Sequence, residues 1–415
     1  MTDLDTRLRT ADRITAPDLW SDIVGRSPGP ELGHGPGPGR RVAAAAVALA
    51  VATVGGYLVV RSFGGSSREA PAPPEPAAQA DGLPSVELAV TDVVDVGGPI
   101  GSVEAGDGAL FVAVSANDGS NGGRVVRIDP ATGEAVLEVA LDTVPNWEVG
   151  GQGMTVSEGV LWVGGGHDGP GGGGAVQAVD AGGGEVLDRV VLDGQPVADV
   201  AVSEDGVWVL EFGPGPGSPA RVVRLDPETH DVVGTVPLTQ PYARQIVAAG
   251  GGIWVHERRS QDATVTESVL TRIDPEGGAV DLTVPLDGYA AGFEAVGGGL
   301  WAAASDDDVA NMLQRLIRID AVTGEVLDRH ELGPTMTVRD VFGSGSDGSL
   351  WFVGSTGTGS SLHRFDPVEG RVDATVDLPA DLTPTALAVT PSSVWVANYE
   401  GSVTRIEIRG EGGTA

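Results

Sequence analysis

The chain has 415 residues, a formal net charge of -33 and no Cys, which excludes a disulfide framework and a thiolate metal site. The negative charge argues against binding to nucleic acid or anionic lipid, because phosphate groups are bound by stripes of Lys and Arg. Nine of the acidic residues and eight of the Arg residues lie in the first 85 positions, so nearly all the negative charge belongs to the remainder of the chain.

Residues 1–40 are predicted to form a largely disordered tail, because the Gly/Pro run from Ser27 to Gly39 cannot form a packed element. Ahead of that run, the segment around Trp20 favours one or two helical turns, with Leu19 and Ile23 on one face. Two interpretations stay open. The segment is an incidental helix in a disordered tail, or it is a docking motif for a cytoplasmic partner.

An apolar stretch of 19 residues, Val42–Val60, contains no charge. As a helix it would be about 28 Å long, close to the thickness of the hydrocarbon core of a bilayer. Arg residues are more frequent before this stretch than after it, and this bias places the N-terminus in the cytoplasm and the large domain outside. We therefore expect a single-pass transmembrane helix at 41–61, in the cell membrane.

The alternative is a cleaved signal peptide, with Ala78–Ala80 as the cleavage site. The apolar stretch is longer than usual for a signal peptide, and the candidate site lies well beyond it, so a retained anchor is favoured. Residues 62–85 are rich in Pro and Ala, which predicts an extended, semi-rigid spacer.

From residue 86 the chain repeats. The repeats are marked by Trp residues 44 to 50 positions apart, and Phe111 stands in the same place 51 residues before the first of them. The Trp positions are Trp162, Trp208, Trp254, Trp301, Trp351 and Trp395. A second marker of the type Arg-Ile-Asp-Pro follows each aromatic run, as at Arg127–Pro130.

Seven repeats of this length, each with four short β-rich runs, are typical of a β-propeller. The fold class is therefore all-β, a seven-bladed propeller of four-stranded blades over residues 86–409, with 410–415 as a disordered tail. Small residues of each first run suit the crowded central channel, and each Trp would fill the wedge between blades. The last repeat stops after three strands, so we expect Val86–Val96 to supply its outer strand and close the ring.

Asp in the second marker is expected to accept hydrogen bonds from backbone N–H groups in the turn that follows it, and a Gly there can take a positive φ. Because one such Asp or Glu stands in every repeat, we interpret these residues as turn formers and not as metal ligands. No metal site or cofactor is expected. The oxygen-rich runs Asp306–Asp308 and Asn117–Gly119 could hold Ca²⁺, but solvated acidic residues are the favoured interpretation.

These repeats resemble those of YVTN-type propellers and of streptogramin (virginiamycin B) lyase-like propellers, over Val86 to Arg409. The lyase resemblance implies a metal-assisted elimination, with Mg²⁺, by a His and a Glu on one face of the ring. The candidates here are His256 and Glu257, which adjoin each other after a predicted second strand and would point in opposite directions within a strand.

In a propeller the connections between the second and third strands, and between one blade and the next, share one face. We expect aromatic and charged residues in these connections to form a ligand-binding rim. The predicted binding residues are Trp147, Tyr242, Arg244, His256, Tyr289, Arg339 and Tyr399.

Three classes of function follow from the sequence. The leading one is a membrane-tethered extracytoplasmic module that binds or senses a protein or a small molecule through this rim. The others are a lyase-like enzyme on the same rim and a purely structural scaffold. The acidic domain would repel anionic ligands, which favours neutral or cationic ligands or a protein partner.

Overall fold

The computed structural model describes residues 82–410, apart from 116–121, 143–152, 167–172, 194, 214–217, 259–267, 287, 306–313, 334–335 and 356–358. The predicted tail, the predicted transmembrane helix and nearly all of the spacer lie outside the described residues. Within the described part of the chain, no helix has both the length and the hydropathy needed to cross a membrane.

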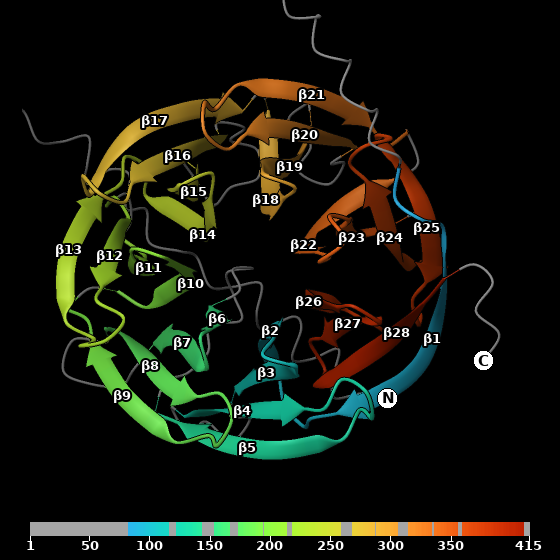
Figure 1. Ribbon diagram of the computed structural model, residues 1–415, viewed down its shortest axis with the longest axis horizontal. Helices are drawn as coiled ribbons and strands as arrows, with labels where there is room; N and C mark the ends of the chain where they lie inside the picture. Colours follow the sequence, from blue (N-terminus) through green and yellow to red (C-terminus); the bar gives the residue numbers. More distant parts are fainter. Residues whose placement is uncertain are drawn as a thin grey trace, which may run out of the picture. The chain divides into compact units, whose positions relative to one another are not determined.

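The described chain forms seven antiparallel sheets of four strands each, arranged as blades around a central channel (Figure 1). This confirms the predicted seven-bladed propeller. Blade 1 consists of β2 (Ile100–Gly106), β3 (Ala109–Ser115), β4 (Gly123–Ile128) and β5 (Ala135–Leu141). Blade 2 consists of β6 (Met154–Ser157), β7 (Val160–Gly166), β8 (Gly174–Asp180) and β9 (Val186–Val191). Blade 3 consists of β10 (Val197–Ser203), β11 (Gly206–Glu211), β12 (Arg221–Leu225) and β13 (Val232–Pro237).

Blade 4 consists of β14 (Tyr242–Ala249), β15 (Gly252–Arg258), β16 (Ser268–Asp274) and β17 (Ala279–Leu286). Blade 5 consists of β18 (Tyr289–Val296), β19 (Gly299–Ser305), β20 (Arg315–Asp320) and β21 (Val326–Glu331). Blade 6 consists of β22 (Thr337–Ser344), β23 (Leu350–Ser355), β24 (Ser360–Asp366) and β25 (Arg371–Asp377). Blade 7 consists of β26 (Pro384–Thr390), β27 (Ser393–Asn398), β28 (Ser402–Gly410) and β1 (Val86–Asp95).

The aromatic residue of each second strand, Phe111 in blade 1 and Trp in the others, is buried between its own blade and the next. Trp208 on β11 is fully buried and packs in one apolar cluster with Ile246 and Val255 of blade 4. The Arg of the second marker lies opposite it on the third strand, with the Arg224 guanidinium 5.2 Å from the centre of the Trp208 ring. Arg224 also donates to the carbonyl oxygen of Pro275 in blade 4, at 2.8 Å, so one side chain joins two blades.

The turns between third and fourth strands have the predicted chemistry. Asp129 accepts hydrogen bonds from the backbone N–H groups of Ala131 and Thr132, at 2.7 and 3.3 Å, and Gly133 has a φ of 74°. Asp226 and Asp320 make the equivalent contacts in their blades. These carboxylates are thus used in forming turns.

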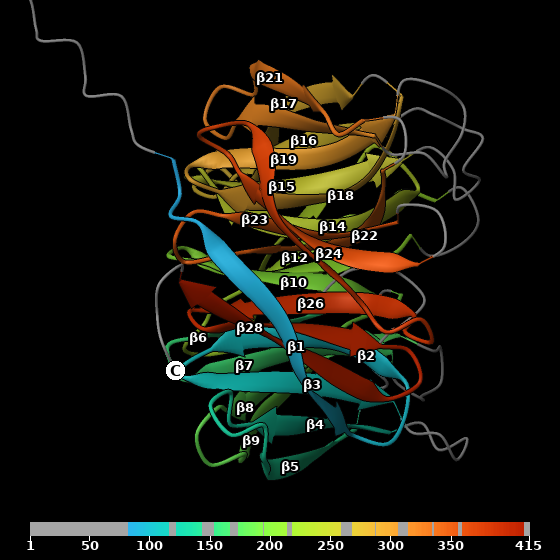
Figure 2. The ribbon, with the colours of Figure 1, turned by 90° about the vertical axis from the view of Figure 1, so that its right-hand side faces the viewer.

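The ring is closed by the strand at the start of the described chain. β1 pairs with β28 in antiparallel register from Val86↔Gly410 to Asp95↔Ser402, and Figure 2 shows β1 on the outside of the ring beside β28. The predicted closure by the N-terminal strand is confirmed. The entry to β1 is held by blade 6, where Arg364 donates to the Pro84 carbonyl oxygen at 2.8 Å and Asp366 accepts from the Leu83 N–H at 2.6 Å.

The two faces of the ring differ in their connections. On one, here called the turn face, first and second strands are joined by turns as short as residues 107–108, 158–159 and 204–205. On the other, the loop face, second strands are joined to third strands, and each blade to the next. These connections range from residues 287–288 to residues 142–153. Because Val86 lies opposite the end of β28, the chain enters the ring at the turn face.

Candidate functional site

The central channel is lined by the first strand of every blade. In each blade, one residue of the first strand pairs directly with the Trp or Phe of the second strand. This residue marks the equivalent position in all seven first strands. In blade order these residues are Glu104, Thr155, Ala201, Val247, Glu294, Gly343 and Ala388. Two of the seven are carboxylic acids, and Asp199 lies two residues before the aligned position in blade 3.

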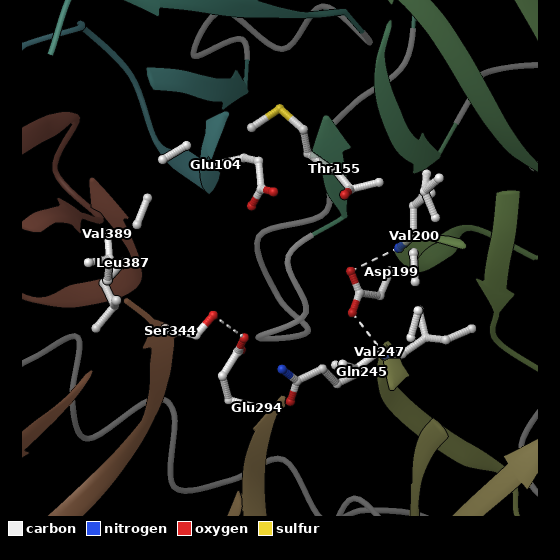
Figure 3. Close-up of a pocket in the computed structure, with 18 residues that line it drawn as sticks. Glu104, Thr155, Asp199, Val200, Gln245, Val247, Glu294, Ser344, Leu387 and Val389 are labelled. Atoms are coloured by element: carbon white, nitrogen blue, oxygen red, sulfur yellow. Dashed lines mark hydrogen bonds between the residues drawn. The ribbon is translucent and has the colours of Figure 1, made fainter. Parts of the chain in front are cut away.

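These acids face a cavity of about 260 Å³ in the channel. In the close-up, Glu104, Asp199 and Glu294 approach it from three sides, from blades 1, 3 and 5 (Figure 3). The described residues that line the cavity include no Arg, Lys or His, so no cation among them balances the three carboxyl groups.

Asp199 is buried and ties blade 3 to blade 4. One carboxylate oxygen accepts from the Val200 N–H and the other from the Ile246 N–H of β14, each at 2.9 Å. Burial raises the pKa of Asp199 to about 7, although these backbone donors act in the opposite direction.

Gln245 makes the same kind of bridge one blade further, without a charge. Its side-chain amide donates to the Phe293 carbonyl oxygen at 2.7 Å and accepts from the Phe293 N–H at 3.0 Å. Blades 4 and 5 are therefore joined by a neutral amide at the position that Asp199 occupies between blades 3 and 4.

Glu294 and Glu104 complete the set. The Ser344 hydroxyl of blade 6 donates to Glu294 at 3.0 Å, and burial raises the pKa of Glu294 to about 7. Burial raises the pKa of Glu104 to about 8, with further contributions from the charges of Glu294 and Asp199, while a hydrogen bond to the Val156 backbone in blade 2 lowers it. The three acids thus interact electrostatically across the cavity.

The carboxyl groups do not form a metal cage. In the described parts of the chain, no three or more His, Asp or Glu side chains are placed to hold one metal ion. The three carboxyl groups instead share one buried space, where burial and mutual repulsion make each of them costly to ionise.

The predicted catalytic candidates do not form a pair. His256 is 2% exposed, lies edge-on to the Phe293 ring, and has no hydrogen-bond partner at either ring nitrogen. Burial, with the charges of Arg258 and Arg244, lowers the pKa of His256 to about 3. Glu257 has partners of its own, since it accepts from the backbone N–H groups of Thr239 and Gln240 at 2.9 and 2.8 Å.

Most of the other predicted rim residues lie in strands, where loops were expected. Tyr242 and Arg244 are in β14, Tyr289 is in β18 and Arg339 is in β22, as His256 is in β15. The expectation was wrong because these strands extend further toward the loop face than their apolar cores indicate, with a bulge between Ala243 and Gln245.

The structure brings part of the predicted rim together. Tyr242 pairs across the sheet with Arg258, and the Arg258 guanidinium donates to the Tyr289 hydroxyl at 2.6 Å. With Arg244 and His256, these residues gather at the loop-face end of the contact between blades 4 and 5. Tyr399 lies separately, in the β27–β28 connection of blade 7. Trp147 and the side chain of Arg339 lie outside what the structure describes.

Glu104, Asp199 and Glu294 were not predicted to be channel residues. A single acid within a strand of small residues has no pattern of its own. The signal that reveals these acids is the alignment of each first strand on the Trp or Phe of the next strand, which places Glu104 and Glu294 at the aligned position and Asp199 two residues before it.

Comparison with known proteins identifies the fold. The chain is similar to the crystal structure of the WD40 β-propeller domain of Doa1, with a TM-score of 0.52 and 13% sequence identity, over 77% of this chain and 97% of that one. No family model and no curated protein matches the sequence. The similarity supports a propeller fold alone, and the resemblance to the YVTN-type and lyase-like families stays a prediction.

Proposed function

We propose that the protein is a membrane-tethered binding module that holds an extracytoplasmic partner on its loop face. The observation that carries this proposal is the unequal distribution of connections. The turn face is built from short turns, whereas the longest and most variable connections gather on the loop face. Rigid scaffolds present binding residues on such variable loops.

The position of the tether supports the same face. The chain enters β1 at the turn face, where Leu83 and Pro84 are bound to blade 6. A spacer that joins the ring at the turn face leaves the loop face free for a partner. The tether itself is inferred from the apolar stretch Val42–Val60 and its flanking Arg residues.

The charge of the domain indicates the class of partner. A strongly acidic chain with three carboxyl groups in its channel disfavours anions, which favours a protein with a basic or neutral surface, or a neutral or cationic small molecule. The geometry supports binding better than a lyase-like elimination, because His256 and Glu257 have separate surroundings and the pKa of His256 is far below neutral.

The absence of Cys from the sequence permits a direct test of the tether. Glu204 and Glu400 are exposed, the first on the turn face and the second on the loop face. In intact cells, a membrane-impermeant maleimide is expected to label Glu204→Cys and Glu400→Cys, and to label Ser27→Cys only after permeabilisation. Labelling of Ser27→Cys in intact cells would contradict the proposed orientation, and a propeller released into the medium would indicate a cleaved signal peptide.

The same variants test the binding face. With a photoreactive maleimide attached, Glu400→Cys is expected to crosslink to a partner on the cell surface, while Glu204→Cys, as the matched control, is not. Adding Tyr242→Ala to Glu400→Cys should lower the crosslinking yield about tenfold, as expected for an aromatic residue central to an interface. Crosslinking from the turn face alone would refute the proposal, and no crosslink from either face would favour a scaffold.

A further inference from the structure

We propose that the channel carboxyl groups make the cohesion of the ring depend on pH, so that proton uptake by Glu104, Asp199 and Glu294 tightens the propeller and proton loss loosens it. This goes beyond the proposed binding function and does not rest on it. It concerns the contacts between blades, which any function of the loop face would share.

The three acids are placed at contacts between neighbouring blades. Each lies on a first strand and is hydrogen-bonded to the next blade, Glu104 at blades 1 and 2, Asp199 at blades 3 and 4, and Glu294 at blades 5 and 6. All three also face one cavity, as Figure 3 shows. Charge on them therefore acts between blades that lie across the channel from one another.

The residues that line the cavity offer little to offset negative charge. It is lined by β2, β6, β10, β14, β18, β22 and β26, and the three acids are the only titratable groups among the described residues that line it. The polar side chains that accompany them are the neutral Thr155, Gln245 and Ser344. The described lining residues include no cation, so a second or third negative charge in this space repels the first.

The shifts in pKa of the three acids determine whether stability rises or falls with pH. The pKa values of the three acids are raised in the folded ring, to about 8 for Glu104 and about 7 for Asp199 and Glu294. The folded state thus holds protons that the unfolded chain has already lost. Stability from this source is present at low pH and is lost as the pH rises through 7 to 8.

The composition of the chain makes this window unusually clear. Lys and Cys, whose side chains titrate in the alkaline range, are absent from the sequence. Burial lowers the pKa values of His256 and His363 to about 3 and 4, so both are neutral throughout the window. Burial also raises the pKa values of Glu211 and Asp373 outside the channel, so the channel's share of a change in stability between pH 7 and 9 is the part that substitutions in the channel remove.

The test is the melting temperature of the full-length protein between pH 7 and pH 9. We expect it to fall by about 5 °C in the wild type, and to stay level in the variant E104Q/D199N/E294Q. Glu104→Gln alone should reduce the fall, and serves where the triple variant does not fold. Glu228→Gln, on an exposed turn, is the matched control and should keep the wild-type slope.

A variant that adds a carboxyl group provides the converse test. Gln245 donates to the Phe293 carbonyl oxygen, so a Glu in its place can repeat that bond only when protonated. Gln245→Glu should therefore steepen the fall in melting temperature. A wild-type melting temperature that stays level or rises from pH 7 to 9, or a triple variant that keeps the wild-type slope, would overturn the proposal.

Discussion

Deletion of residues 86–95 is expected to destabilise the propeller by about 5 kcal/mol or more. The deletion removes the outer strand of blade 7 and its ladder with β28, and with it the apolar side chains of Leu88 and Val94, which pack against two buried apolar clusters. Two or three apolar side chains at about 1.5–3 kcal/mol each account for this magnitude. That is a large share of the stability of an ordinary domain.

The matched control is deletion of residues 70–79, which removes the same length of chain from the predicted spacer. Melting followed by circular dichroism should show a strongly lowered transition for the first deletion and an unchanged one for the second. Aggregation of the first variant is also expected, because β28 would become an unpaired sheet edge. Equal melting of the two variants would show that β1 does not close the ring.

Replacing Trp208 by Ala is expected to cost about 3–5 kcal/mol in the free energy of unfolding, the range for a large buried aromatic residue. The side chain is fully buried in the wedge between blades 3 and 4. Its loss also removes the support of the Arg224 guanidinium and the hydrogen bond from the indole N–H to the Ser203 hydroxyl, at 3.0 Å.

Val233→Ala provides the comparison, because Val233 is 55% exposed on the outer strand of the same blade. Its effect should stay within about 0.5 kcal/mol, as is usual for surface positions. Chemical denaturation of both variants measures the difference. A loss below about 1 kcal/mol for Trp208→Ala would mean that the wedge between blades does not depend on this ring.

The repeats made most of the fold predictable. The Trp spacing indicates seven blades, and the incomplete last repeat indicates that an N-terminal strand completes it. The sequence analysis did not predict the role of the third-strand Arg, although it recurs in nearly every marker. That role depends on strand register, which places Arg224 opposite Trp208 and within reach of blade 4.

The candidate site was predicted less well, for a physical reason. Channel residues become neighbours only when the ring closes, so Glu104 and Glu294, far apart in the sequence, share no local pattern. Residues near the loop face were assigned to loops because their strands end in polar residues. Tyr242 and Tyr289 are nevertheless in strands, where Tyr242 pairs across the sheet with Arg258 and the Arg258 side chain donates to the Tyr289 hydroxyl.

β1, the strand that follows the predicted spacer, closes the ring by pairing with β28. A disulfide between these two strands tests this pairing most directly. Ala89 and Glu407 lie opposite each other in β1 and β28, where Cα atoms of paired residues are close enough for a disulfide. Under mild oxidation, full-length Ala89→Cys/Glu407→Cys should form this disulfide within one molecule, seen by mass spectrometry. The out-of-register pair Ala89→Cys/Ser402→Cys should not. Failure of the first pair to link, or linkage only between molecules, would contradict the claim.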